Sequence, residues 1–161
     1  MERNSTRSSV LTEFSPNISE IEVKYKNKIK PFDRKSIVSS TNSTEILREI
    51  WNPNTIEMQE DFILLLLNRN NKLLGWVKIS SGGLDGTVCD PKIIFSIALK
   101  CLASSIIVAH NHPSGNKNPS SADTQLTKVI KDAGELLGIR LLDHVILTTE
   151  TYFSYADEGL L

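Results

Sequence analysis

The run of six apolar residues from Phe62 to Leu67 limits how this chain can fold more than any other stretch. A strand with one face in water alternates apolar and polar side chains, whereas an unbroken apolar run indicates a central strand covered on both faces. The run is far too short to cross a membrane. Turn residues at 68–71 and a second strand-like segment at 72–80 follow it, which predicts a β-hairpin.

Helix signals alternate with strand signals along the rest of the chain. Asp90 followed by Pro91 is a typical helix start, and Gly138 is a typical helix end. The predicted helices cover 42–51 (capped by Asn42 or Ser43), 91–102 and 120–137, and the predicted further strands cover 105–109, 141–148 and 152–155. This alternation predicts an α/β fold with a mixed β-sheet flanked by helices.

The amino-terminal segment divides into two parts. Residues 1–19 are rich in Ser, Thr and Asn and are predicted to form a flexible tail, which leaves 20–161 as a single domain. From Ile21 onward apolar residues alternate with lysines, which predicts a half-buried edge strand. Its polar face carries four lysines: Lys24, Lys26, Lys28 and Lys30. A solvated strand edge is the favoured interpretation of this row, and weak nucleic-acid contact is the alternative.

Composition bounds the partners and the compartment. The formal net charge of -1 gives no global argument for binding nucleic acid or an anionic membrane. Cys89 and Cys101 form no close pair in the sequence, so we expect free thiols and a reducing environment. The first residues lack the apolar core of a signal peptide. We therefore expect a cytoplasmic protein without membrane contact, and the sequence does not indicate its oligomeric state.

The stretch from His110 to Asp123 carries metal-binding side chains. Residues two apart in an extended segment project to the same side, so His110 and His112 can face one ion at the end of a strand. Asp123 lies one turn into the next predicted helix, and a folded-back loop can bring its carboxylate to the same ion. Two histidines, one carboxylate and a free fourth position are the components of an open zinc site. Ser120 and Asp123 also form a capping box, with Asp in place of the usual Glu or Gln, and the two interpretations are compatible.

The same stretch resembles a known signature. His110-X-His112-Pro113, six residues, Ser120, two residues and Asp123 resemble the JAMM signature of the JAB/MPN metalloprotease superfamily. Within that superfamily the longer string 110–115, with 119–120, 137–139, 142–144 and the ending 153–161, is similar to the RadC family. The similarity covers about 40–161 and implies a JAB/MPN sandwich, a fold of the cytidine-deaminase-like type. The helix-hairpin-helix region that often precedes this domain in RadC proteins is missing from the sequence, which disfavours a DNA-repair interpretation.

The resemblance implies a hydrolase that cleaves a peptide or isopeptide bond with Zn²⁺. The implied zinc ligands are His110, His112 and Asp123, and Ser120 would help to hold the developing oxyanion. Zinc lowers the pKa of its bound water to about 7. His144 is either a group that supports the ligands or a structural histidine.

A general base is the remaining part of such a site. In JAMM proteins a glutamate before a hydrophobic strand takes the proton and passes it to the leaving amine. Glu60, just before the 62–67 run, occupies that place in this sequence. Asp61 is the first alternative and Glu57 the second.

The sequence also bears on two other functional classes. The first is a nucleic-acid-associated module, linked to DNA repair, with a structural or vestigial metal, for which the lysine row is the only support. The second is a zinc deaminase, which requires His-X-Glu and a downstream Cys-X-X-Cys. Neither of those two motifs is found in this sequence, which argues strongly against a deaminase.

Overall fold

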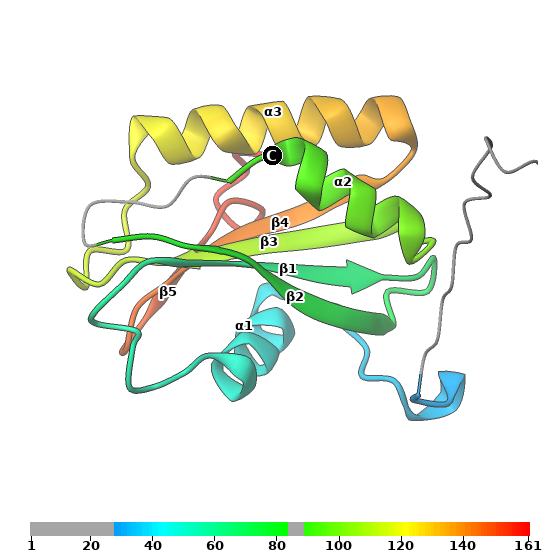
Figure 1. Ribbon diagram of the computed structural model, residues 1–161, viewed down its shortest axis with the longest axis horizontal. Helices are drawn as coiled ribbons and strands as arrows, with labels where there is room; N and C mark the ends of the chain where they lie inside the picture. The colour runs from blue at the N-terminus through cyan, green and yellow to red at the C-terminus, as the bar shows by residue number, and fades with distance from the viewer. Residues whose placement is uncertain (1–27, 84–88) are drawn as a thin grey trace, which may run out of the picture.

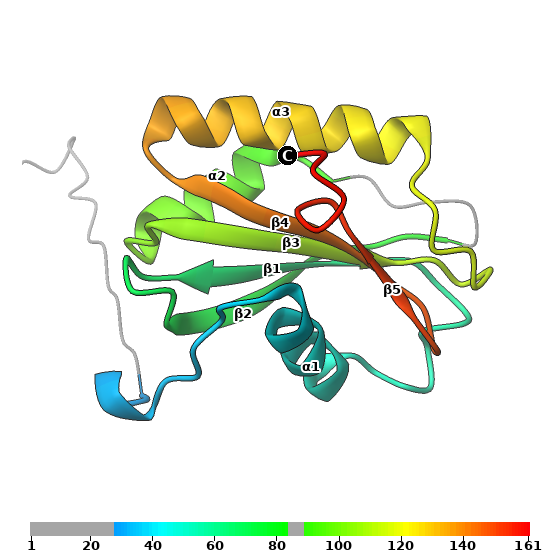
Figure 2. The ribbon, with the colours of Figure 1, turned by 180° about the vertical axis from the view of Figure 1, so that it is seen from behind.

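A mixed five-stranded sheet forms the centre of the protein. The computed structural model describes residues 28–83 and 89–161. The sheet order is β2-β1-β3-β4-β5; β3 and β4 are parallel, and the other neighbouring pairs are antiparallel. Helix α1 lies on one face of the sheet, and α2 and α3 lie on the other (Figures 1 and 2). The strands are β1 (Asp61–Leu67), β2 (Leu73–Ser81), β3 (Ser105–Asn111), β4 (Arg140–Leu147) and β5 (Tyr152–Ser154), and the helices are α1 (Ser40–Ile50), α2 (Pro91–Lys100) and α3 (Ser121–Leu137), with a short 3-10 helix at Pro31–Asp33. The predicted α/β fold with a mixed sheet flanked by helices is confirmed.

Strand β1 is buried on both faces, as its apolar run predicts. Every residue of β1 is buried, and the strand lies between β2 and β3. Ile63, Leu65 and Leu67 pack in the core under α1. Phe62 and its alternate neighbours pack in the second core, under α2 and α3. Burial of both faces explains why no polar residue interrupts this run.

The helix ends follow local capping chemistry, with one correction. The Asp90 side chain accepts a hydrogen bond from the Lys92 amide at the start of α2, and Gly138 ends α3 in the left-handed region at φ 68°. The predicted cap of α1 at Asn42 or Ser43 is wrong. The helix begins earlier because the hydroxyl of Ser39 accepts a hydrogen bond from the Asn42 amide, which makes Ser39 the cap.

The predicted lysine-rich edge strand is not found at residues 28–30, the part of it that the structure describes. Residues 28–30 are exposed and not in a strand, because Pro31 starts the 3-10 helix directly after them. The remainder of that predicted strand, with Lys24 and Lys26, and the predicted tail 1–19 lie outside the described residues.

The strand directions bring three segments to one end of the sheet. The parallel strands β3 and β4 both end there, and the antiparallel β1 begins there, so that Phe62 pairs with His110 and His110 pairs with Ile146. The amino-terminal end of α3 reaches the same place after the loop 112–120 (Figure 2). Ligands in α/β proteins are commonly held at such an end.

Two further observations concern the expected environment. Cys89 and Cys101 are both free thiols, as the sequence predicts. Among the described residues no helix combines the length and the apolar character that a membrane span needs.

Candidate metal centre

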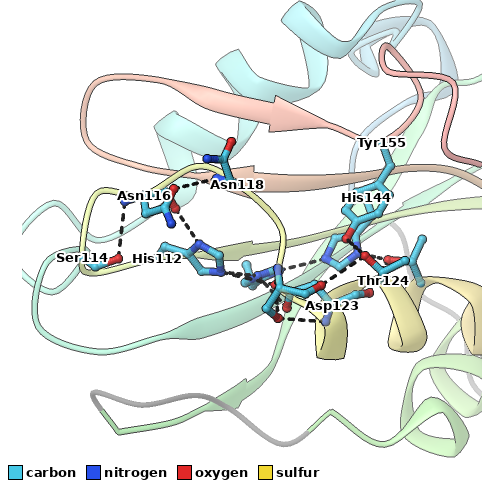
Figure 3. Close-up of polar contacts among 11 residues, drawn as sticks. His112, Ser114, Asn116, Asn118, Asp123, Thr124, His144 and Tyr155 are labelled. Atoms are coloured by element: carbon cyan, nitrogen blue, oxygen red, sulfur yellow. Dashed lines mark hydrogen bonds and ion pairs between the residues drawn. The ribbon is translucent and has the colours of Figure 1, made fainter.

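The two histidines of the His-X-His motif and the Asp123 carboxylate converge at this end of the sheet. His110 Nε2 lies 3.0 Å from His112 Nε2 and 3.2 Å from Asp123 Oδ1. Asp123 Oδ2 lies 3.6 Å from His112 Nε2, and one ligand atom from each of the three residues falls within 4.8 Å of the others. Figure 3 shows His112, in the loop after β3, turned toward Asp123 in the first turn of α3. The structure therefore brings together the three residues that were predicted as metal ligands.

The end of β3 sets the orientation of both histidines. β3 continues to Asn111, so His110 lies within the strand and is 1% exposed. The His112 amide donates a 3.0 Å hydrogen bond to the Leu147 carbonyl, which extends the β3–β4 pairing by one residue. Because the backbone stays extended, the two histidines keep the two-residue period and face the same side.

The separations between donor atoms suit a tetrahedral ion. With zinc–ligand bonds of about 2.0–2.1 Å, neighbouring ligand atoms of a tetrahedral site are about 3.3 Å apart. The separations of His110 Nε2 from His112 Nε2 (3.0 Å) and from Asp123 Oδ1 (3.2 Å) are close to that value, whereas the oxygen that lies 3.6 Å from His112 Nε2 is the other one, Oδ2. Two imidazole nitrogens and a carboxylate oxygen are also a donor set that zinc prefers.

The loop after β3 determines which nitrogen of His112 is free. His112 Nδ1 lies 2.6 Å from the Asn116 carbonyl oxygen (Figure 3). A carbonyl only accepts hydrogen bonds, so Nδ1 carries a proton, and Nε2 of a neutral His112 presents a lone pair. That lone pair faces a carboxylate and another imidazole nitrogen, an arrangement that a cation or a proton must stabilise. The residues present therefore fit a bound divalent metal ion.

The capping box of α3 holds the carboxylate. The Ser120 amide and hydroxyl donate to Asp123 Oδ2 at 2.7 and 2.6 Å, and the Asp123 amide donates back to Ser120 Oγ at 3.1 Å. Both members of the box are thus satisfied, and Oδ1 is the oxygen directed at His110. The single hydroxyl proton of Ser120 is directed at Asp123 here.

The electrostatics of the metal-free centre agree with this geometry. Burial alone would raise the pKa of the Asp123 carboxyl, but its contacts with His110 and His112 and the hydrogen bond from Ser120 outweigh burial and lower that pKa. The hydrogen bond with Asp123 raises the pKa of His112, burial opposes this shift, and the negative charge of Glu60 contributes to the increase. Without metal, the raised pKa means that His112 is protonated more readily than an ordinary histidine.

Glu60 lies at the edge of this centre. It immediately precedes β1 and is held by two backbone hydrogen bonds, with its amide donating to the Gly83 carbonyl and its carbonyl accepting from the Gly82 amide. Glu60 lies two residues before Phe62, whose ring stacks on His110 at 6.0 Å, and by the two-residue period of an extended chain we expect its side chain on the His110 side of the sheet. Its negative charge also makes the smallest of the contributions to the raised pKa of His112.

The two alternative carboxylates have different surroundings. Asp61 is 1% exposed and forms an ion pair with Lys78 at 2.7 Å, and it accepts a hydrogen bond from Ser81 Oγ at 2.6 Å. Its side chain is therefore committed to β2. Glu57 is exposed in the loop before β1.

The sequence analysis missed Asn111, the middle residue of the His-X-His motif. This fully buried side chain accepts from the Asp61 amide at 2.7 Å and donates to the carbonyls of Ile56 and Gln59 at 2.6 and 2.9 Å. It therefore binds the peptide groups on both sides of Glu60. The position of an amide side chain between two candidate ligands could have suggested a supporting role. Its partners could not be predicted, because they lie about fifty residues upstream.

His144 lies directly behind the ligands. Its ring is fully buried, with Nε2 2.8 Å from His110 Nδ1 and Nδ1 2.6 Å from Thr127 Oγ1. Burial, and then the proximity of His110, lower the pKa of His144 well below its usual value, so that the ring is neutral. Thr127, which the sequence did not single out, is thus the next member of this chain of contacts.

The mixed sheet between helical layers, with a strand-end His-X-His pair facing a helix-borne aspartate, defines a JAB-type domain with a candidate metal-binding triad. A family model described as the RadC-like JAB domain matches residues 37–160, and this chain belongs to that family.

Several bacterial relatives support this assignment. A protein of Flavobacterium johnsoniae is 42% identical over 126 residues, which are 78% of this chain and 54% of the relative. Proteins of Porphyromonas gingivalis (48% identical, covering 64% of this chain and 46% of the relative) and Aquifex aeolicus (41%, covering 80% and 54%) are similar in the same way. All three bear the name UPF0758 protein. This chain spans about half the length of these curated relatives.

Proposed function

We propose that this protein is a zinc-dependent hydrolase that cleaves a peptide or isopeptide bond. The observation that carries the proposal is the convergence of two imidazole nitrogens and the Asp123 carboxylate, with one ligand atom of each residue within 4.8 Å of the others. The family supports it, because the JAB/MPN superfamily to which the domain is related includes metalloproteases.

Each residue has a role in this proposal. The zinc is held by His110, His112 and Asp123. When bound, the ion supplies a Lewis acid and lowers the pKa of water in the open position to about 7. Glu60 takes the proton from the attacking water and delivers it to the leaving amine. Ser120 fixes Asp123, and its hydroxyl would turn from that carboxylate to the oxyanion of the substrate.

The metal is tested first. The purified protein should contain one zinc ion per chain by elemental analysis, and His110→Ala and Asp123→Ala should lose it while circular dichroism shows an intact fold. Absence of zinc from the unaltered protein, after incubation with the metal, would refute the proposal.

The chemistry is tested with peptide and isopeptide libraries. Glu60→Gln should keep zinc and lose hydrolysis by 10²-fold or more, roughly the contribution of a general base. Glu57→Gln changes the second alternative for the base, an exposed carboxylate in the same loop, and should hydrolyse normally if Glu60 is the base. Full activity of Glu60→Gln would exclude that residue as the base.

The competing interpretation predicts a different result. A nucleic-acid-associated module would bind DNA in a salt-dependent way and hydrolyse no library member. In that case we propose that the weak contact with nucleic acid is made by Lys24, Lys26, Lys28 and Lys30. The two free thiols fit the reducing cytoplasm that the sequence predicts.

A further inference from the structure

A chain of buried polar contacts runs from helix α3 to the nitrogen that His110 directs away from the metal centre. Thr127 Oγ1 lies 2.6 Å from the Asp123 carbonyl oxygen and 2.6 Å from His144 Nδ1. His144 Nε2 lies 2.8 Å from His110 Nδ1. Thr127 is 3% exposed and His144 is fully buried, so no solvent molecule is needed to complete the chain.

The direction of each hydrogen bond follows from counting protons. The Thr127 hydroxyl has one proton, and the carbonyl of Asp123 can only accept it. The hydroxyl must therefore accept from His144, whose Nδ1 carries the proton. A neutral imidazole that is protonated on Nδ1 accepts on Nε2, so His110 donates through its own Nδ1. His110 Nε2 is then unprotonated.

Aromatic packing fixes the planes of the two rings. Tyr155 stacks on His144 with centroids 5.1 Å apart and an interplanar angle of 10° (Figure 3). Phe62 stacks on His110 at 6.0 Å and 1°. The stacking fixes the plane of each ring, and a half-turn within that plane would replace nitrogen by carbon in the contacts of His144 with His110 and Thr127, so these hydrogen bonds select the ring orientation.

We propose that Thr127 and His144 are positioning residues that hold His110 as the Nδ1–H tautomer and so keep the Nε2 lone pair directed at the metal centre before any ion binds. This inference rests on the proposed function for the identity of the ion. Groups behind a metal-binding histidine generally act in this way, fixing its tautomer and its ring orientation.

The tautomer can be tested in the metal-free protein. The chain has three histidines, so long-range ¹⁵N–¹H correlation spectra can be assigned by single substitution. Unaltered protein should show His110 protonated on Nδ1 and unprotonated on Nε2. Thr127→Val removes the hydroxyl but keeps the shape of the side chain. His144 then loses its acceptor at Nδ1 and should move its proton to Nε2, which transfers the His110 proton to the metal side.

Thr127→Ser keeps the hydroxyl and is the matched control. It should show the tautomer of the unaltered protein, whereas Thr127→Val should bind zinc about 10- to 100-fold more weakly in chelator competition, the usual effect of losing such support. A His110 protonated on Nε2 in the unaltered protein, or equal zinc affinity in the two variants, would overturn the inference.

A second variant covers the case in which Thr127→Val does not fold. His144→Phe keeps a ring to stack on Tyr155 and removes both nitrogens, so His110 should populate both tautomers and bind zinc more weakly. Undiminished zinc affinity in His144→Phe would overturn the inference. If the unaltered protein binds no zinc, the proposed function fails, while the nitrogen spectra still decide the tautomer of His110.

Discussion

The backbone amide of Asp61 donates a 2.7 Å hydrogen bond to the side chain of Asn111, and this contact joins the start of β1 to the end of β3. The same side chain donates to the carbonyls of Ile56 and Gln59. Glu60 is thereby held between peptide groups that are bound to the residue separating the two candidate histidine ligands. The backbone around the proposed base is thus hydrogen-bonded to the same strand end that carries the two histidines.

Asn111→Ala should separate these two parts. It leaves one buried donor and two carbonyls without their partner, which should reduce the free energy of unfolding by about 2–3 kcal/mol. Zinc stoichiometry should be unchanged, since no ligand is altered, while kcat falls because Glu60 is no longer held in place. Urea unfolding, elemental analysis and hydrolysis assays measure the three effects. Loss of stability without any change in kcat would contradict the positioning role.

Ser120→Ala should weaken the start of α3. It removes the side-chain half of the capping box, which typically costs about 1 kcal/mol of stability. Unfolding with a chelator present measures the loss of the cap without any contribution from metal binding. Ser120→Thr, which keeps the cap, is the control. If the hydroxyl also serves the oxyanion, kcat should fall in Ser120→Ala, and an unchanged kcat would restrict Ser120 to capping.

Zinc affinity should depend on pH through His112. Its pKa is raised in the metal-free protein, chiefly by the hydrogen bond with Asp123, whose own pKa is lowered so that it stays ionised. Protons compete with zinc for His112, so the apparent affinity should fall as pH decreases below the raised pKa and level off above it. Zinc titrations from about pH 5.5 to 8.5, around the ordinary histidine pKa of about 6.5, would show this dependence.

The stability of the metal-free protein should depend on pH in the opposite direction and decrease as pH rises. A pKa raised on folding means that protonated His112 stabilises the fold below the unfolded-state pKa and that this contribution is lost as pH rises through the folded-state pKa. Thermal unfolding with a chelator present measures it. Asp123→Asn removes the main cause of the shift, and an unaltered pH profile in that variant would contradict the assignment.

Gly134 should tolerate no side chain. A Cβ at this position in α3 would meet the Ile139 carbonyl oxygen, which is backbone, and would lie 3.5 Å from Phe95 Cζ. Gly134→Ala should therefore reduce the free energy of unfolding by about 1–3 kcal/mol, as overpacking generally does. Gly75→Ala is the control, because its Cβ would meet nothing within 4 Å. Equal urea midpoints for the two variants would be inconsistent with this packing.

Local patterns were sufficient where the interaction is local. The apolar run 62–67 predicted a strand buried on both faces, because the polarity of a strand depends on what covers it. Asp90 and Gly138 predicted helix ends, because capping involves residues within one turn. The wrong cap of α1 has the same origin, since several Ser, Thr and Asn residues in succession offer equivalent acceptors and the pattern cannot rank them.

The sequence by itself determined the α/β class and the spacing of His110, His112 and Asp123, since both depend on the periods of strands and helices. Only the tertiary structure decided what surrounds these residues. Asn111 reaches a loop about fifty residues upstream, and His110 contacts a histidine 34 residues downstream. Such contacts depend on strand order and register, and here the antiparallel pairing of β1 with β3 and the parallel pairing of β3 with β4 create them. Neither pairing leaves a local mark on the residues that it brings together.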